Sequence, residues 1–94
     1  MTIGLLTLHL GIPACASLKD KRSRLKPLIH RLHRQFNISV AEMNLQDKWQ
    51  EAVIACAMVN RDRAHIQRSL QAVVEWVERN CADMDVMDDR LEII

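Results

Sequence analysis

One stretch near the start of the chain decides the fold: residues 5–12 read LLTLHLGI. Its even-numbered positions are all Leu or Ile, whereas its odd-numbered positions include Thr7 and His9. Successive side chains of a β-strand point to opposite faces, so this period of two predicts a strand with one face in the core. Pro13 follows the stretch and predicts its end, because proline donates no ladder hydrogen bond.

Residues 17–36 predict a helix, because apolar side chains recur there at steps of three and four. Ser17 followed by Asp20 resembles a capping box in which the shorter acid replaces the usual Glu. Pro27 lies inside the pattern, which predicts a kinked helix or one that begins late. The apolar stripe of this helix consists of Leu18, Leu25, Leu28, Ile29, Leu32 and Phe36.

A hairpin is expected next. Residues 37–43 alternate again, and residues 52–59 are apolar throughout, as in a central strand that is covered on both sides. The connection between them, residues 44–51, is polar around Trp49 and longer than a two-residue turn. Three polar residues near this connection are expected to hydrogen-bond within the hairpin or to line a small polar pocket: Glu42, Gln46 and Asp47.

The C-terminal half predicts a second helix and a last strand. Asn60 or Asp62 is placed to cap the helix. Residues 83–94 read as a charged strand, and such charge suits the edge of a sheet because it discourages pairing with other chains. The second helix has an inward stripe of Ile66, Leu70, Val73, Val74, Val77 and Cys81.

The expected order is strand, helix, strand, strand, helix, strand, in a single domain of residues 1–94 because a chain this short has room for one core. Two helices that each bury one stripe must share one face of a four-stranded antiparallel sheet. This arrangement predicts an α+β, ferredoxin-like fold. The other face of the sheet is then open, and its apolar side chains make it a candidate contact for a partner.

Positive charge is concentrated in the first predicted helix, although the formal net charge of the chain is only +1. Residues 17–36 carry seven Lys or Arg against one acid, Asp20. A helix of this kind predicts salt-sensitive binding to RNA phosphates, as expected for an RNA-associated accessory factor. The candidate nucleic-acid-binding residues are Lys19, Lys21, Arg22, Arg24, Lys26, Arg31 and Arg34.

Two other interpretations stay open. The cations also fit a solvated helix surface that pairs with the acidic C-terminal strand, which carries Asp85, Asp88 and Asp89. Alternatively, the chain is a protein-interaction or homodimerisation module. In that case Trp49 of the hairpin connection is exposed and contacts the partner, rather than covering the edge of the core. The candidate partner-binding residues are Leu5, Thr7, His9, Trp49, Val53, Ala55 and Ala57.

No pattern in the chain predicts catalysis, a cofactor or a metal, so we expect a non-enzymatic protein. His30 and His33 lie three residues apart, but a metal site needs three or four ligands and no second pair has suitable spacing. Cys56 and Cys81 fall in core patterns, which leaves Cys15 near a helix start as the one candidate reactive thiol. Unpaired cysteines and an apolar start without basic residues favour the cytoplasm over export.

Four stretches follow one another in a recognisable order and spacing: LGIP at residues 10–13, SLKDKR at 17–22, FNISVAE at 36–42 and QDKWQ at 46–50. Together they resemble the YlxP-like family of small bacterial proteins of unknown function. The resemblance implies a ferredoxin-like fold. It also implies a ribosome-linked role, because in several bacteria the family's gene lies among those for translation initiation and ribosome maturation. His9 and Gly11 depart from the polar residues more usual for the family.

Overall fold

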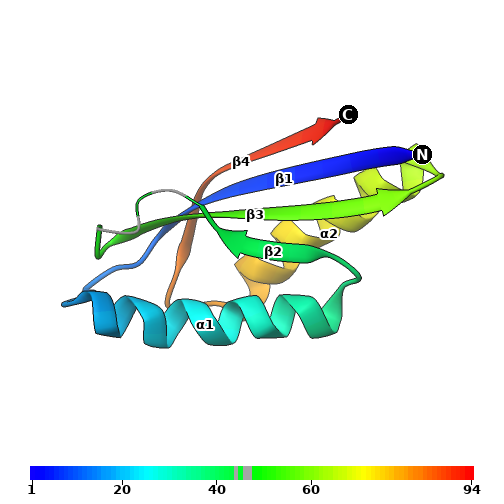
Figure 1. Ribbon diagram of the computed structural model, residues 1–94. Coiled ribbons are helices and arrows are strands. Elements are labelled where there is room, and N and C mark those ends of the chain that lie inside the picture. Colours follow the sequence, from blue (N-terminus) through cyan, green and yellow to red (C-terminus); the bar gives the residue numbers. More distant parts are fainter. Residues whose placement is uncertain (44, 46–47) are drawn as a thin grey trace.

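The computed structural model describes residues 1–43, 45 and 48–94 and contains the six expected elements in the expected order. All strand pairs are antiparallel, and the sheet order is β2-β3-β1-β4. The predicted α+β, ferredoxin-like fold is therefore confirmed (Figure 1). The elements are β1 (Thr2–Gly11), α1 (Leu18–Gln35), β2 (Ser39–Glu42), β3 (Glu51–Asn60), α2 (Arg63–Asn80) and β4 (Asp85–Ile93).

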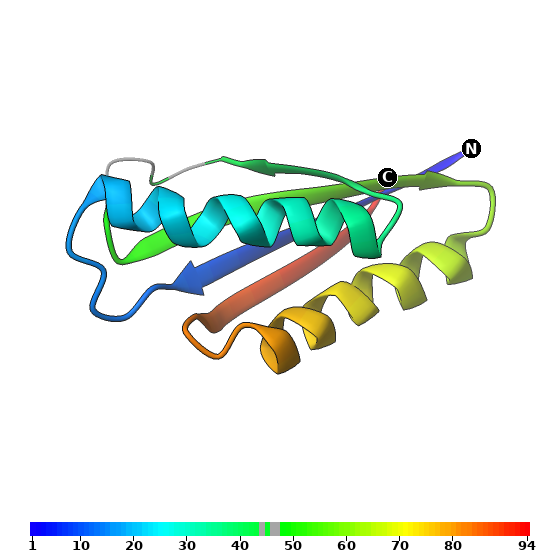
Figure 2. The same ribbon diagram turned by 90° about the horizontal axis from the view of Figure 1, so that it is seen from below.

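The two central strands supply the sheet's half of the core. Leu6, Leu8 and Leu10 of β1 are fully buried, as their alternation predicts, and Leu8 lies opposite Ile54 of β3. The expectation that β3 is covered on both sides is wrong, because every second residue of β3 is buried and the positions between are not. Both helices lie on the same side of the sheet, so the opposite face has no cover from the described residues (Figure 2).

The outer strands are shorter than the sequence suggests. β2 keeps only four of the seven residues expected, and it pairs with residues 54–57 of β3. Ile38, just before it, is buried in the core instead of extending the strand. β4 forms the other edge, and the register between β1 and β4 shifts between His9 and Leu10.

Helix α1 begins where its cap predicts. The Ser17 hydroxyl accepts a hydrogen bond from the Asp20 amide at 3.0 Å, and the Asp20 carboxylate accepts one from the Ala16 amide at 3.2 Å. The first bond satisfies one of the amides that a helix start leaves without partners, and the second ties the residue before the cap to the first turn. The late start that Pro27 predicts is wrong, because the helix begins at Leu18 and runs unbroken through Pro27 to Gln35. Pro27 is exposed, and so is Ser23, four residues earlier. Because proline has no amide hydrogen, the Ser23 carbonyl receives no hydrogen bond from Pro27 and can bind water instead.

Helix α2 packs closely on the sheet because one residue beneath it has no side chain. It begins at the N-cap Asp62, whose carboxylate accepts hydrogen bonds from the amides of Ala64 and His65. Its inward stripe is buried against β1, β3 and β4, as predicted. A Cβ at Gly4 would overlap Ile66 and lie 2.8 Å from a methyl of Leu70. Helix α1 lies along the β2 side of the sheet and α2 along the β4 side (Figure 2).

Candidate functional site

A buried lysine joins α1 to the hairpin connection. The side chain of Lys21 is 2% exposed, and its ammonium donates hydrogen bonds to the carbonyl oxygens of Leu45 at 2.6 Å and Lys48 at 2.7 Å. The carboxylate of Glu42 lies 3.2 Å from the same nitrogen as an ion pair. A lysine is buried in this way only when several oxygens replace water around its charge. Lys21 therefore fixes the connection to the first turns of α1.

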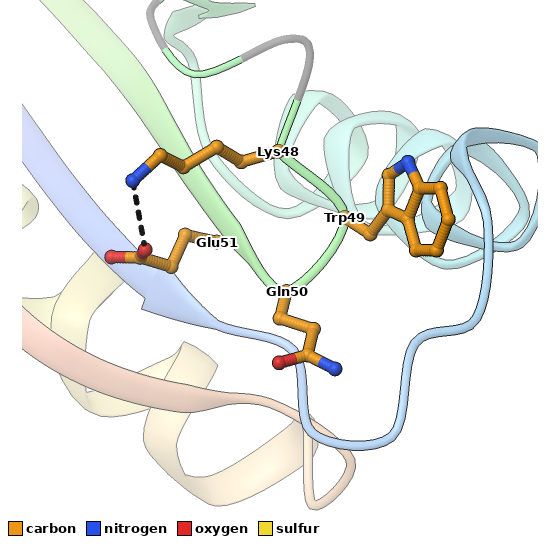
Figure 3. Close-up of a pocket in the computed structure, with 4 residues that line it drawn as sticks. All are labelled: Lys48, Trp49, Gln50 and Glu51. Atoms are coloured by element: carbon orange, nitrogen blue, oxygen red, sulfur yellow. Dashed lines mark ion pairs between the residues drawn. The ribbon is translucent and has the colours of Figure 1, made fainter.

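Trp49 lies in this connection and is 50% exposed. Of the two alternatives for its side chain, the structure supports the exposed one over a lid on the core. Hydrogen bonds fix the backbone on both sides of Trp49. The Lys48 carbonyl accepts one from the Lys21 ammonium, and the Gln50 carbonyl accepts one from the Ile12 amide at 2.8 Å. An open hollow of about 430 Å³ is lined by residues 48–51 (Figure 3). The indole points away from the ion pair of Lys48 with Glu51 (Figure 3).

Beyond Trp49, contacts between polar side chains continue onto the open sheet face. Glu51, the first residue of β3, accepts a hydrogen bond from Nε2 of His9 at 2.8 Å, and its other oxygen lies 3.7 Å from the ammonium of Lys48. His9 and Asp88 are register partners on β1 and β4. These charges mark the end of the open face next to the hairpin connection, and they belong to partly exposed side chains.

The seven candidate cations of α1 do not form one surface. The expectation that Lys21 binds nucleic acid is wrong, because its ammonium is buried and already surrounded by three oxygens. Its position explains this: Lys21 lies four residues before Leu25 and seven before Leu28, on the apolar stripe. Four cations remain without an ion pair or hydrogen bond in the part of the chain that the structure describes, and we call them the cation row: Lys19, Arg22, Lys26 and Arg34.

The other two cations on α1 have partners. Arg24 donates to the carbonyl oxygen of Pro13 at 2.9 Å and lies 3.4 Å from the carboxylate of Asp20. The hydrogen bond from the Ala16 amide and the charge of Arg24 hold the pKa of Asp20 below its usual value of 3.8. The guanidinium of Arg31 lies over the ring of Trp76, 4.8 Å from its centroid, as a cation–π contact.

Trp76 is half-buried where α1 and α2 meet. Its ring meets that of Phe36 edge to face at 6.3 Å, a favourable arrangement for two aromatic rings. Both are packed against the core. Trp76 therefore lies at the border of the core.

The acids of β4 do not pair with the cation row. Among the described residues, no ion pair joins α1 to β4, and the one ion pair that involves β4 links Arg90 to Glu92 within the strand. β4 lies at the sheet edge beyond β1, whereas α1 lies on the β2 side (Figure 2). The interpretation in which these acids neutralise the helix is therefore wrong for Asp85, Asp88 and Asp89.

The candidate partner face is brought together by the sheet. In the register of β1 with β3, Leu5 lies opposite Ala57, Thr7 opposite Ala55 and His9 opposite Val53. All six are partly exposed, and Val59 on the same face is 60% exposed. Trp49 lies in the connection just before β3, next to the end of this face marked by His9. Gln46 and Asp47 of the expected polar pocket lie outside the described residues.

The thiols and histidines are not assembled into a reactive site. Cys15 is 1% exposed and its thiol donates to the Ser17 carbonyl at 3.4 Å, so it has no access to a substrate. Burial raises the pKa of Cys56 to about 12 and also raises that of Cys81. Nδ1 of His33 donates a hydrogen bond to the carbonyl oxygen of Ile38 at 3.0 Å. Within residues 1–43, 45 and 48–94, no three His, Cys, Asp or Glu residues are grouped to hold a metal, and no helix could span a membrane.

Sequence reasoning did not find the role of Lys21. The available signal was its helical spacing with Leu25 and Leu28, which places a charged residue on the buried stripe. It also did not find the stacking of Arg31 on Trp76, because these residues are 45 positions apart and only the packing of α1 beside α2 brings them together. Lys21 is buried by its contacts, whereas Arg31 stays exposed with its guanidinium over the Trp76 ring.

The fold and these surfaces define a small ferredoxin-like α+β protein with an open sheet face, a clamped hairpin connection and a row of unpaired cations. The chain belongs to the family described as "Protein of unknown function (DUF503)", whose model matches residues 3–90. It is 36% identical over 62 residues to the "Uncharacterized protein YlxP" of Bacillus subtilis (strain 168). That match covers 66% of this chain and 67% of the relative. The YlxP-like resemblance is thereby confirmed.

Proposed function

We propose that this protein binds the phosphates of RNA through the cation row of α1. The observation that carries the proposal is the lack of any ion pair or hydrogen bond for Lys19, Arg22, Lys26 and Arg34 within the described residues. Cations without protein partners keep their charge available for an external anion. The binding would take place in the cytoplasm, the compartment expected from the three free cysteines.

The geometry of the helix supports several contacts at once. Spacings of three, four and eight residues keep the cation row on one side of a helix with 3.6 residues per turn. Lys19 and Arg34 are separated by about 22 Å along the axis. The buried leucines of α1 lie on the opposite side of the helix, and all four side chains of the row are exposed. Several phosphates of one RNA can contact a surface of this length.

The expected mode is electrostatic and largely blind to sequence. Sheet-based RNA recognition needs aromatic side chains on the central strands, and β1 and β3 contain none. Phosphate contacts release condensed counterions, so the affinity falls steeply with salt. Four contacts predict a slope of log K against log salt of about −3.

The test is a titration of a fluorescent fragment of ribosomal RNA at several salt concentrations. The triple variant Lys19→Glu, Arg22→Glu, Lys26→Glu should abolish binding without unfolding the chain, because all three side chains are exposed. Lys21 is excluded from this variant because its ammonium is buried. The matched control has the same change in charge on exposed arginines at the start of α2: Arg61→Glu, Arg63→Glu, Arg68→Glu.

Binding that survives in the α1 triple variant would contradict the proposal. Equal losses in the α1 and α2 variants would also contradict it, because net charge alone would then explain the effect. An affinity that does not change with salt would exclude a phosphate-based mode. The supporting result is a loss of RNA affinity in the α1 variant alone, together with a weaker dependence of its remaining affinity on salt.

A second candidate function is homodimerisation through the open sheet face. The observation in its favour is the apolar outer face of a central strand: Val53, Ala55 and Ala57 are partly exposed, and Val59 is 60% exposed. Apolar side chains gathered on one sheet face are typical of a contact surface. Light scattering should then show a dimer that Ala57→Lys disrupts and that Ala64→Lys, an exposed position on α2, leaves intact. A monomer at high concentration would exclude this function.

A further inference from the structure

We propose that Trp49 is a stacking platform for an unpaired nucleobase of the RNA that the cation row binds. The proposal rests on the RNA-binding function above and adds the class of RNA: a single-stranded segment. It starts from an exposed indole that the fold holds in place.

The backbone around Trp49 is clamped from two independent elements. The Lys48 carbonyl before it accepts from the buried Lys21 ammonium of α1 at 2.7 Å, and the Gln50 carbonyl after it accepts from the Ile12 amide at 2.8 Å. Lys48 and Glu51 also form an ion pair at 3.7 Å. A binding side chain on a fixed backbone loses less conformational freedom when its ligand arrives.

The indole ring has no aromatic or cation–π partner in the part of the chain that the structure describes. The other tryptophan shows the contrast: Trp76 has Phe36 at its edge and Arg31 over its face. Trp49 has neither an aromatic nor a cationic neighbour within stacking distance among the described residues, and half of its surface is exposed. In Figure 3 the ring projects away from Lys48 and Glu51, so their ion pair does not cover it.

The surroundings favour a nucleobase over a protein partner. Protein hot-spot tryptophans lie at the centre of apolar, water-excluding patches. The hollow is open to solvent, and apart from the indole itself it is lined by Lys48, Gln50 and Glu51 rather than by further apolar side chains. An isolated aromatic ring beside a cationic surface is the arrangement that binds single-stranded nucleic acid, because every base has a face that can stack.

The clamp also ties the connection to α1 close to part of the cation row. Arg22 and Lys26 line one hollow together with Glu42, whose carboxylate pairs with the Lys21 ammonium that holds the connection. A single strand whose phosphates follow α1 towards its N-terminus therefore reaches the hairpin connection. In a duplex the bases are already stacked in pairs, so Trp49 would add nothing to duplex binding.

The experiment compares a 12-nucleotide oligouridine with a blunt 12-base-pair RNA duplex. Trp49→Ala should weaken oligouridine binding by about 5- to 150-fold, the range seen for loss of one stacked base. It should leave the duplex affinity and the salt slope unchanged, because no phosphate contact is lost. Trp49→Phe, which keeps an aromatic face, should restore most of the affinity. In a Trp76→Phe variant all tryptophan fluorescence comes from Trp49, and oligouridine should quench this fluorescence.

The outcomes separate this proposal from the one it rests on. If oligouridine binds wild type with the expected salt slope but Trp49→Ala binds it equally well, the stacking platform is excluded and phosphate binding by α1 stands. If neither RNA binds wild type, both proposals fail. If Trp49→Ala converts a dimer to a monomer while RNA affinity is unchanged, the ring serves a second copy of the chain, and the stacking proposal is overturned.

Discussion

The ammonium of Lys21 donates a hydrogen bond to the carbonyl oxygen of Lys48, 27 residues away in the chain, at 2.7 Å. A second bond from the same nitrogen, to Leu45, is 2.6 Å long. The buried ammonium of Lys21 thus holds α1 and the hairpin connection together. The residue that seemed a member of the basic surface supports the backbone that presents Trp49.

We expect Lys21→Met to destabilise the protein by about 2 to 4 kcal/mol, because two carbonyls and a carboxylate lose their buried partner. The matched control is Lys19→Met, which removes the same charge from an exposed position of the same turn and should change stability by less than about 0.5 kcal/mol. Denaturant unfolding of the two variants measures the difference. Equal stabilities would show that the bonds of Lys21 contribute nothing to the fold.

Gly4→Ala should destabilise the protein by about 1 to 3 kcal/mol. The added methyl would overlap Ile66 and crowd Leu70, so α2 would have to move away from β1. Thermal unfolding measures the effect. Gly11→Ala is the control, because there the nearest atom is the flexible thioether of Met87 at 3.1 Å. A Gly4→Ala variant as stable as wild type would show that α2 does not pack as closely as described.

The start of α1 should be sensitive to both mutation and acid. Ser17→Ala removes the acceptor for the Asp20 amide and should cost about 1 kcal/mol in the free energy of unfolding. The folded state lowers the pKa of Asp20, so its contribution is present above pH 3.8, its ordinary value, and is lost as the pH falls through the lower folded value. Asp20→Asn should therefore weaken the loss of stability in acid. Unfolding curves from pH 2 to pH 6 test this, and parallel curves for wild type and variant would contradict it.

The three thiols should be protected from alkylation until the protein unfolds. All are buried, and burial raises the pKa of Cys56 to about 12, so the reactive thiolate is scarce at neutral pH. Iodoacetamide at pH 8 should label the native protein slowly and the denatured protein at all three positions. Because the folded pKa of Cys56 is above the unfolded one, its effect on stability is full at neutral pH and is lost only as the pH rises towards 12. Rapid labelling of Cys15 in the native state would reopen a reactive role for that thiol.

Local patterns were sufficient to predict the architecture. The alternation of residues 5–12 and the apolar stripes of the two helices predicted which side chains are buried, and Leu6, Leu8 and Ile66 are indeed fully buried. The cap at Ser17 was predictable because its hydrogen bonds join residues three and four positions apart. The outer strands were less predictable, since the length of β2 depends on its partner β3 rather than on its own residues.

The candidate site was predictable only in part, because it also depends on contacts between segments that are far apart in the chain. The sequence alone determined that cations are concentrated in the first helix, that a tryptophan lies in the hairpin connection and that one sheet face is apolar. Only the tertiary structure decided that Lys21 is buried, that Arg31 stacks on Trp76 and that the acids of β4 lie away from α1. Periodicity follows from bonds between near neighbours in the chain, whereas the free charge of a surface depends on contacts between distant segments, and these exist only once the chain is folded.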